Sequence, residues 1–141
     1  MKDRKFFFIL VLQLLAAMAV FAAVVYWHGQ WNTTRWVGLC IGFPALVGLF
    51  VSRFQLGKSF AVTPQAKELV THGLYSKIRN PMYLFVCLLI VGFALATQLW
   101  MVLMLLIVLV PMQLIRSKQE SQVLEQKFGD EYRAYRKRTW F

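Results

Sequence analysis

The chain is 141 residues long, and 59% of its residues are hydrophobic while only 16% are charged. A soluble domain carries about a quarter charged residues, so this composition excludes an ordinary water-soluble globular protein. A bilayer-spanning helix uses about 20 apolar residues, and four such stretches leave roughly a third of the chain for connections. A separate soluble catalytic domain is therefore excluded, and any chemistry has to reside on the helices and the segments that join them.

The net charge of +10 is better explained by its distribution than by nucleic-acid binding. Arg35 stands alone between the first two apolar runs. The other 15 of the 16 Lys and Arg residues precede the first run, separate the second from the third, or follow the fourth. This asymmetry obeys the positive-inside rule and predicts cytoplasmic N and C termini. We expect an integral membrane protein, in the inner (cytoplasmic) membrane if it is bacterial, with membrane lipids and no nucleic acid among its partners.

The first two apolar runs cover about residues 6–27 and 36–54. Residues 6–27 exceed the apolar core of a cleaved signal peptide, so we predict an anchor that is retained. The second run contains Gly38 and Gly42, and two glycines at this spacing let helices approach closely. We expect this pair to pack within the chain, and a homodimer through Gly38 and Gly42 is the alternative.

The last two apolar runs cover about residues 81–96 and 99–115, and so little separates them that they predict a tight hairpin. Pro111 is expected to kink the fourth helix near its cytoplasmic end. Beyond residue 115 the helical pattern continues with polar residues until Gly129 ends it. The sequence thus predicts a single all-α membrane domain over residues 1–141. It would have about four transmembrane helices, a cytoplasmic loop over 55–80 and a cytoplasmic C-terminal helix within the tail 116–141.

The connection over residues 55–80 is too long for a turn and too rich in apolar anchors for disorder, which predicts a functional loop. It contains neither a Gly-rich phosphate loop nor a dinucleotide fingerprint. His28 and His72 fall on opposite predicted sides of the membrane, so no metal site is expected. The Arg, Tyr, Asn and Glu residues that remain suit the binding of a charged cofactor, with catalysis by positioning.

Two blocks of residues resemble one known family. The first is Leu69-Val70-Thr71-His72-Gly73-Leu74-Tyr75 followed by Ile78-Arg79-Asn80-Pro81-Met82-Tyr83, and the second comprises Arg116, Glu120, Leu124, Phe128-Gly129, Glu131-Tyr132 and Tyr135. Their order around the hairpin is similar to the signature of the isoprenylcysteine carboxyl methyltransferase and phospholipid methyltransferase superfamily. The resemblance covers about residues 69–138, half of the chain.

The resemblance implies an integral membrane enzyme that uses S-adenosylmethionine at the cytoplasmic surface. It assigns cofactor binding to two walls formed by His72, Gly73, Tyr75, Arg79, Asn80, Pro81 and Tyr83 on one side and Arg116 and Glu120 on the other. Arg79, Asn80 and Glu120 are the implied catalytic residues. Two positions depart from the family pattern, because Asn80 stands where a histidine is common and Ser121 replaces the second glutamate of a pair.

The residue types fit this cofactor on chemical grounds as well. Glu120 can accept hydrogen bonds from ribose hydroxyls or an ammonium group, and Arg79 or Arg116 can pair with a carboxylate. Tyr75 or Tyr83 can present a ring face to the sulfonium cation. The methyl acceptor is expected to be hydrophobic, of the isoprenylcysteine carboxylate or phospholipid amine class.

The sequence leaves three alternatives to this interpretation open. Arg116 and Glu120, four residues apart, can form a solvated helix pair without a binding role. A membrane sterol or steroid reductase that uses NADPH has a similar C-terminal region, although such reductases are much longer. A non-catalytic membrane scaffold that kept the fold is supported by Ser121.

The predicted topology places Thr33 and Thr139 on opposite sides of the membrane. Single cysteines introduced at these positions, in a background that lacks Cys40 and Cys87, should therefore react with an impermeant thiol reagent from opposite faces of sealed vesicles. Labelling of both from the same face would rule this topology out.

Overall fold

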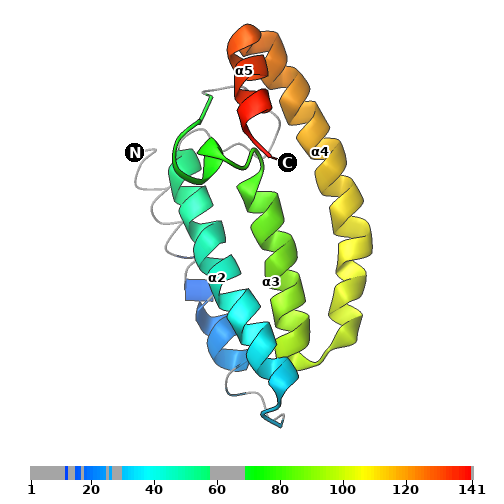
Figure 1. Ribbon diagram of the computed structural model, residues 1–141. Coiled ribbons are helices and arrows are strands. Elements are labelled where there is room, and N and C mark those ends of the chain that lie inside the picture. Colours follow the sequence, from blue (N-terminus) through cyan, green and yellow to red (C-terminus); the bar gives the residue numbers. More distant parts are fainter. Residues whose placement is uncertain are drawn as a thin grey trace.

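The computed structural model describes residues 12, 15, 16, 18–24, 26, 30–57 and 69–140. The elements in these parts are α2 (Thr33–Leu56), the 3-10 turn η2 (Gly73–Ser76), α3 (Pro81–Thr97), the 3-10 turn η3 (Trp100–Leu103), α4 (Met104–Phe128) and α5 (Asp130–Arg138). Helices α2, α3 and α4 run lengthwise in one elongated bundle, and α5 folds back from the end of α4 toward the beginning of α3 (Figure 1). This part of the chain is all-helical, as predicted.

The predicted spans match the helices unevenly. Helix α2 extends the predicted span 36–54 by a few residues at each end, and α3 matches 81–96 closely. The stretches Thr33–Leu56 and Trp100–Phe128 are long and apolar enough to cross a membrane, whereas α3 is apolar but shorter. Most of the predicted first span 6–27 lies outside the described residues, as do residues 58–68 of the loop. Four spans therefore stay a prediction, as do the side on which the termini lie and the membrane that holds them.

Local sequence explains where the helices begin and end. The Asn32 side chain accepts a hydrogen bond of 3.0 Å from the Arg35 amide and caps the start of α2. Pro81 is the first residue of α3, where a missing N–H costs nothing. Gly129, at φ 51°, ends α4 as predicted. Helix α4 continues without interruption through Pro111, so the residue expected to kink the fourth span does not break it.

The closest contact of the bundle joins α2 to α3 through glycine. A methyl group on Gly38 would collide with the backbone at Gly92 and Ala96, and one on Gly92 would collide with the backbone of Gly42. Small residues allow this approach, which gains dispersion contacts where no water is available to drive association. Helix α3 of the same chain thus packs against Gly38 and Gly42, as we predicted from the sequence.

Helix α4 is held very differently. None of its residues is buried. Most of its apolar side chains are exposed, including Leu105, Ile107, Val108 and Met112, while Leu106 and Leu109 are half-buried. A helix that is apolar on all sides and unburied requires a non-aqueous surrounding. We therefore interpret the exposed surface of α4 as lipid-facing.

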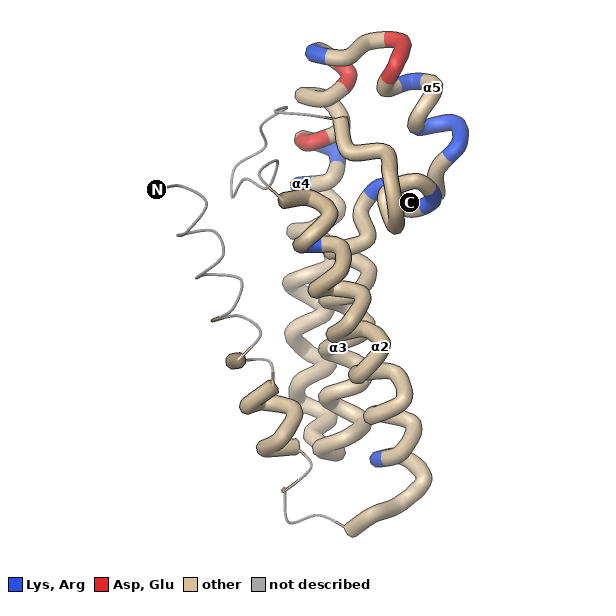
Figure 2. Tube along the Cα trace, turned by 90° about the vertical axis from the view of Figure 1, so that its left-hand side faces the viewer, with Lys and Arg blue, Asp and Glu red and all other residues tan. Residues whose placement is uncertain are grey.

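Arg35 lies at the end of the bundle where α2 begins, opposite the other described basic residues (Figure 2). It is only 1% exposed, its guanidinium donates to the carbonyl of Val24, and it lies 4.4 Å from the ring centre of Trp31. The aromatic face and the carbonyl both stabilise the cation. Arg35 thus ties the helical residues 18–24 to α2, which gives a structural reason for the isolated charge.

The glycine contact predicts different tolerance at two neighbouring positions. Gly38→Ala should lower the melting temperature in detergent, because its methyl group meets backbone that cannot move aside, and overpacking of this kind costs about 1–3 kcal/mol. Gly42→Ala is the matched control, since its methyl group would lie 3.6 Å from the nearest atom, an ordinary contact. Equal melting temperatures for the two variants would contradict this arrangement.

Candidate functional site

Charged residues gather at one end of the bundle, which we call the charged end (Figure 2). It comprises the end of α2, residues 69–80, the beginning of α3, and the chain from Arg116 to Trp140. All nine residues that the resemblance assigns to a site lie in the charged end. Among the described residues, Arg35 is the charged residue at the opposite end, where a short connection joins α3 to α4.

Residues 73–79 are held against α2 by one side chain. Gln55, in the last turn of α2, accepts a hydrogen bond of 2.8 Å from the amide of Leu74. Gly73 is at φ 61°, and a side chain there would also collide with Gln55. Glycine is therefore favoured at position 73 by the backbone conformation, and a side chain there would also displace the end of Gln55. The turn brings Tyr75 into a buried position next to the start of α3.

A three-residue cluster joins α3 to α4. The Tyr83 hydroxyl donates to Oε1 of Glu120 at 2.7 Å, and Nε of Arg116 donates to the same oxygen at 3.1 Å. The side chains of Arg116 and Glu120 are 34% and 29% exposed, so this ion pair is neither buried nor freely solvated. The alternative of a solvated helix pair does not account for the phenol of Tyr83, which comes from another helix.

Two further polar contacts continue along the same helix pair. Asn80 Nδ2 donates to Ser117 Oγ at 2.8 Å, and the Cys87 thiol donates to Gln113 Oε1 at 3.3 Å. Together with the Tyr83–Glu120 bond they form a polar seam between α3 and α4. Because α4 buries no apolar residue, these side chains supply the specific contacts between the two helices. A polar group such as Gln113 is costly among lipid chains unless it has a partner.

The end of the chain closes over residues 73–79. The Tyr135 hydroxyl donates to the carbonyl of Tyr75 at 2.6 Å. Trp140 pairs with this segment as an isolated parallel bridge to Ile78, with backbone hydrogen bonds to Lys77 at 2.7 Å and from Arg79 at 3.1 Å. Burial, together with the nearby phenol of Tyr132, raises the pKa of Tyr135 to about 12, so its hydroxyl keeps the proton that it donates.

A buried donor of Arg79 lies at the charged end. Nε of Arg79 is shielded from solvent and makes no hydrogen bond within the described part of the chain. A buried N–H without an acceptor is costly, and such groups are rare in native structures. A ligand with an anionic oxygen would satisfy it, which makes Arg79 a candidate binding residue on physical grounds.

The structure thus brings most of the proposed site residues together. Asn80, Pro81, Tyr83, Arg116 and Glu120 meet where α3 lies beside α4, while Gly73, Tyr75 and Arg79 lie in the adjoining segment. His72 is exposed, and its side chain makes no hydrogen bond that links it to this cluster.

Sequence reasoning missed Gln55, Ser117 and Gln113. For Ser117 and Gln113 a signal existed, because both lie on the face of α4 that carries Glu120.

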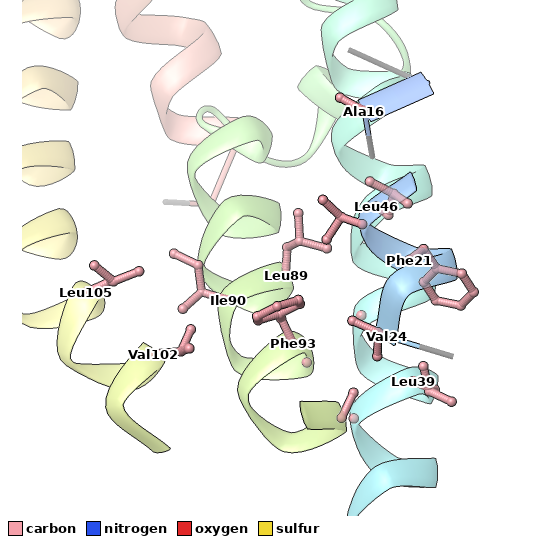
Figure 3. A pocket seen from close by; sticks show the side chains of 15 residues that line it. Ala16, Phe21, Val24, Leu39, Leu46, Leu89, Ile90, Phe93, Val102 and Leu105 are labelled. Carbon is pink, nitrogen blue, oxygen red and sulfur yellow. The ribbon is translucent and has the colours of Figure 1, made fainter. Parts of the chain in front are cut away.

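An apolar cavity of about 450 Å³ lies in the other half of the bundle (Figure 3). It is lined by residues of the N-terminal helical segment, α2, α3 and the beginning of the last long helix: Ala16, Val20, Phe21, Val24, Gly38, Leu39, Gly42, Leu46, Leu89, Ile90, Gly92, Phe93, Ala96, Val102 and Leu105. Phe93 is ten residues from Tyr83, so the two are separated by about 15 Å along α3. The cavity has room for a hydrocarbon chain but no polar lining for a soluble metabolite.

These features define an all-helical membrane protein with a polar site at one end and an apolar cavity beyond it. The family model for phospholipid methyltransferases matches residues 33–131, which is more than half of the chain. The chain therefore belongs to the phospholipid methyltransferase family, a family of membrane methyltransferases, as the resemblance predicted. Searches of curated proteins and of solved structures found no match.

The hydrogen bond of Tyr135 predicts a loss of stability at high pH. An exposed tyrosine ionises near pH 10, whereas folded Tyr135 ionises at about pH 12. Between these values the unfolded chain binds fewer protons than the folded one, so this contribution is complete below about pH 10 and disappears by about pH 12. The melting temperature of Tyr135→Phe should consequently fall less over this range than that of the unaltered protein. Parallel curves for the two proteins would show that Tyr135 is not protected by burial.

Proposed function

We propose that the protein is an S-adenosylmethionine-dependent methyltransferase that acts on a lipid-like acceptor within the membrane. The observation that carries this proposal is the convergence of Tyr83, Arg116 and Glu120 beside the segment that contains Arg79. The family to which the chain belongs supports methyl transfer as the reaction.

The residues present fit the functional groups of this cofactor. The unpartnered Nε of Arg79 suits the cofactor carboxylate, with which an arginine forms charge-assisted hydrogen bonds. Glu120 accepts both of its described hydrogen bonds at Oε1, so its other carboxylate oxygen can accept from a ribose hydroxyl or the ammonium group. Tyr83, whose hydroxyl bonds this carboxylate, and the buried Tyr75 offer aromatic rings that suit a sulfonium cation.

When bound, S-adenosylmethionine supplies a methyl group that is activated by its attachment to a sulfonium sulfur. The protein's own contribution is to orient the cofactor and the acceptor relative to each other and to exclude water from the site. Asn80 is held by Ser117 of α4, and Glu120 is held by Tyr83 of α3 and by Arg116 of its own helix, so both side chains are preorganised. Arg79, Asn80 and Glu120 are the residues to which we assign direct contact with the cofactor.

The apolar cavity supports a hydrophobic acceptor. On α3 its lining runs from Leu89 to Ala96, about 9 to 20 Å beyond Tyr83, which suits a prenyl or acyl chain whose polar end lies at the charged end. Of the two acceptor classes, the phospholipid amine is favoured by the family that matches, and the isoprenylcysteine carboxylate is the second candidate.

The choice of cofactor can be tested by calorimetry with the purified protein in detergent. We expect binding of S-adenosylmethionine and of its demethylated product, and no binding of NADPH. Binding of NADPH alone would replace the proposal with a membrane reductase, and binding of neither would favour a scaffold. Incubation with isotope-labelled methyl donor, in phosphatidylethanolamine vesicles or with N-acetyl farnesylcysteine, followed by mass spectrometry, then identifies the acceptor class.

Glu120→Gln tests the site itself. If Glu120 binds the cofactor, removing its charge-assisted hydrogen bond should weaken affinity by about ten- to a hundredfold, which corresponds to roughly 1.5–3 kcal/mol. Glu125→Gln is the matched control, because Glu125 lies farther along α4 and pairs with Arg133 at 2.8 Å rather than with the cluster. Affinity and melting temperature should be measured for both variants in the same detergent. Equal, small losses of affinity would remove α4 from the cofactor site.

A further inference from the structure

Residues 130–140, which we call the strap, cross from the end of α4 to the beginning of α3. Tyr132 and Tyr135 anchor the strap because both are buried, at 2% and 5% exposure. The Tyr135 hydroxyl and the Trp140 backbone then bind the segment that contains Tyr75 and Arg79. The strap is therefore the element that fixes residues 75–79 from the side opposite Gln55.

The depth of the strap relative to the membrane follows from the length of α3. Its 17 residues span about 26 Å, close to the roughly 30 Å of a bilayer's hydrocarbon core. Pro81 therefore lies near the boundary between hydrocarbon and headgroups. Trp140 is hydrogen-bonded to residues only two and four positions before Pro81, so it lies at the same boundary. The Trp140 side chain is 81% exposed, and tryptophan is enriched at headgroup level.

The strap also concentrates positive charge at this level. Arg136, Lys137 and Arg138 are exposed, and none of them forms an ion pair with a described residue. No acidic residue occurs between positions 132 and 140. Arg133, by contrast, is neutralised by Glu125 and Asp130 at the far end of α4. The unneutralised charge is thus confined to the end of the strap beside Trp140.

We propose that the strap binds the anionic headgroups of the surrounding membrane and that this binding holds residues 75–79 in place. Lys and Arg near an anionic surface are attracted to it, and an adjacent interfacial tryptophan fixes the depth. Because the Trp140 backbone bonds directly to Lys77 and Arg79, lipid contact at the strap orders the segment that carries Arg79. Where this affects the cofactor, the inference rests on the proposed function; the lipid contact itself does not.

The test uses the full chain in nanodiscs of phosphatidylcholine alone and of phosphatidylcholine mixed with phosphatidylglycerol. Hydrogen–deuterium exchange is measured for peptides that cover residues 73–79 and 136–140. We expect slower exchange of both peptides in the anionic discs. One charge near an anionic surface contributes roughly a fivefold effect, so two or more should give at least on the order of tenfold.

A matched pair of variants separates local contact from net charge. Lys137→Gln with Arg138→Gln should remove most of the dependence on phosphatidylglycerol. Lys127→Gln with Arg133→Gln removes the same charge from Lys127 of α4 and from the strap arginine that already pairs with Glu125 and Asp130, so it should preserve the dependence. Trp140→Ala, which keeps the backbone hydrogen bonds available, should weaken the protection in both kinds of disc.

Each outcome is decisive. The lipid contact is overturned if the exchange rates are the same in neutral and anionic discs. It is also overturned if the two double variants reduce the dependence on phosphatidylglycerol equally. Protection in neutral discs after addition of RNA, with none from phosphatidylglycerol, assigns the surface to a nucleic acid and overturns it as well. Cofactor affinity in the two kinds of disc is the second readout. If exchange responds to phosphatidylglycerol but no S-adenosylmethionine binds, the strap proposal stands and the proposed function fails.

Discussion

The contact between Gly38 and Gly42 of α2 and Gly92 of α3 is the constraint on which the remaining structure depends. In lipid, helices associate through close van der Waals contact rather than by escape from water, so the register of two helices is set where their backbones can approach. Here that register places Gln55 at the level of the turn that precedes α3, where it bonds the Leu74 amide. The glycine contact, at one end of the molecule, thereby decides where the polar site forms at the other.

The polar site in turn supplies the specific contacts between α4 and α3. Since no residue of α4 is buried, its position beside α3 is defined by side-chain hydrogen bonds from Asn80, Tyr83 and Cys87. A buried or half-buried hydrogen bond to a charged group contributes about 1.5–3 kcal/mol, so Tyr83 and Glu120 are structural as well as functional candidates. The residues that would bind a cofactor are therefore the same ones that assemble the wall around it.

Much of this architecture could be predicted from sequence, for identifiable reasons. Pro81 and Gly129 gave the start of α3 and the end of α4, because proline and glycine act through local backbone chemistry. Helix α4 begins at Met104, after the turn η3, and not at the predicted residue 99. The grouping of Tyr83 with Glu120 rested on the family resemblance. Gln55 was not predicted, because a single polar residue beside a span has no periodic signal and its partner depends on tertiary register. Ser117 shares a face of α4 with Glu120, but its pairing with Asn80 depends on the same register. Pro111 lies inside α4, which continues through it, and the kink expected there stays a prediction.

The seam between α3 and α4 has a consequence for how this sequence can change over time. The lipid-facing positions of α4, such as Ile107 and Val108, need only remain apolar, so they can drift independently of one another. Positions 80 and 117, 83 and 120, and 87 and 113 are joined in pairs, and a polar group that loses its partner in lipid is penalised. Substitution at one member therefore selects for a complementary change at the other, and the seam evolves as three linked pairs within an otherwise permissive helix.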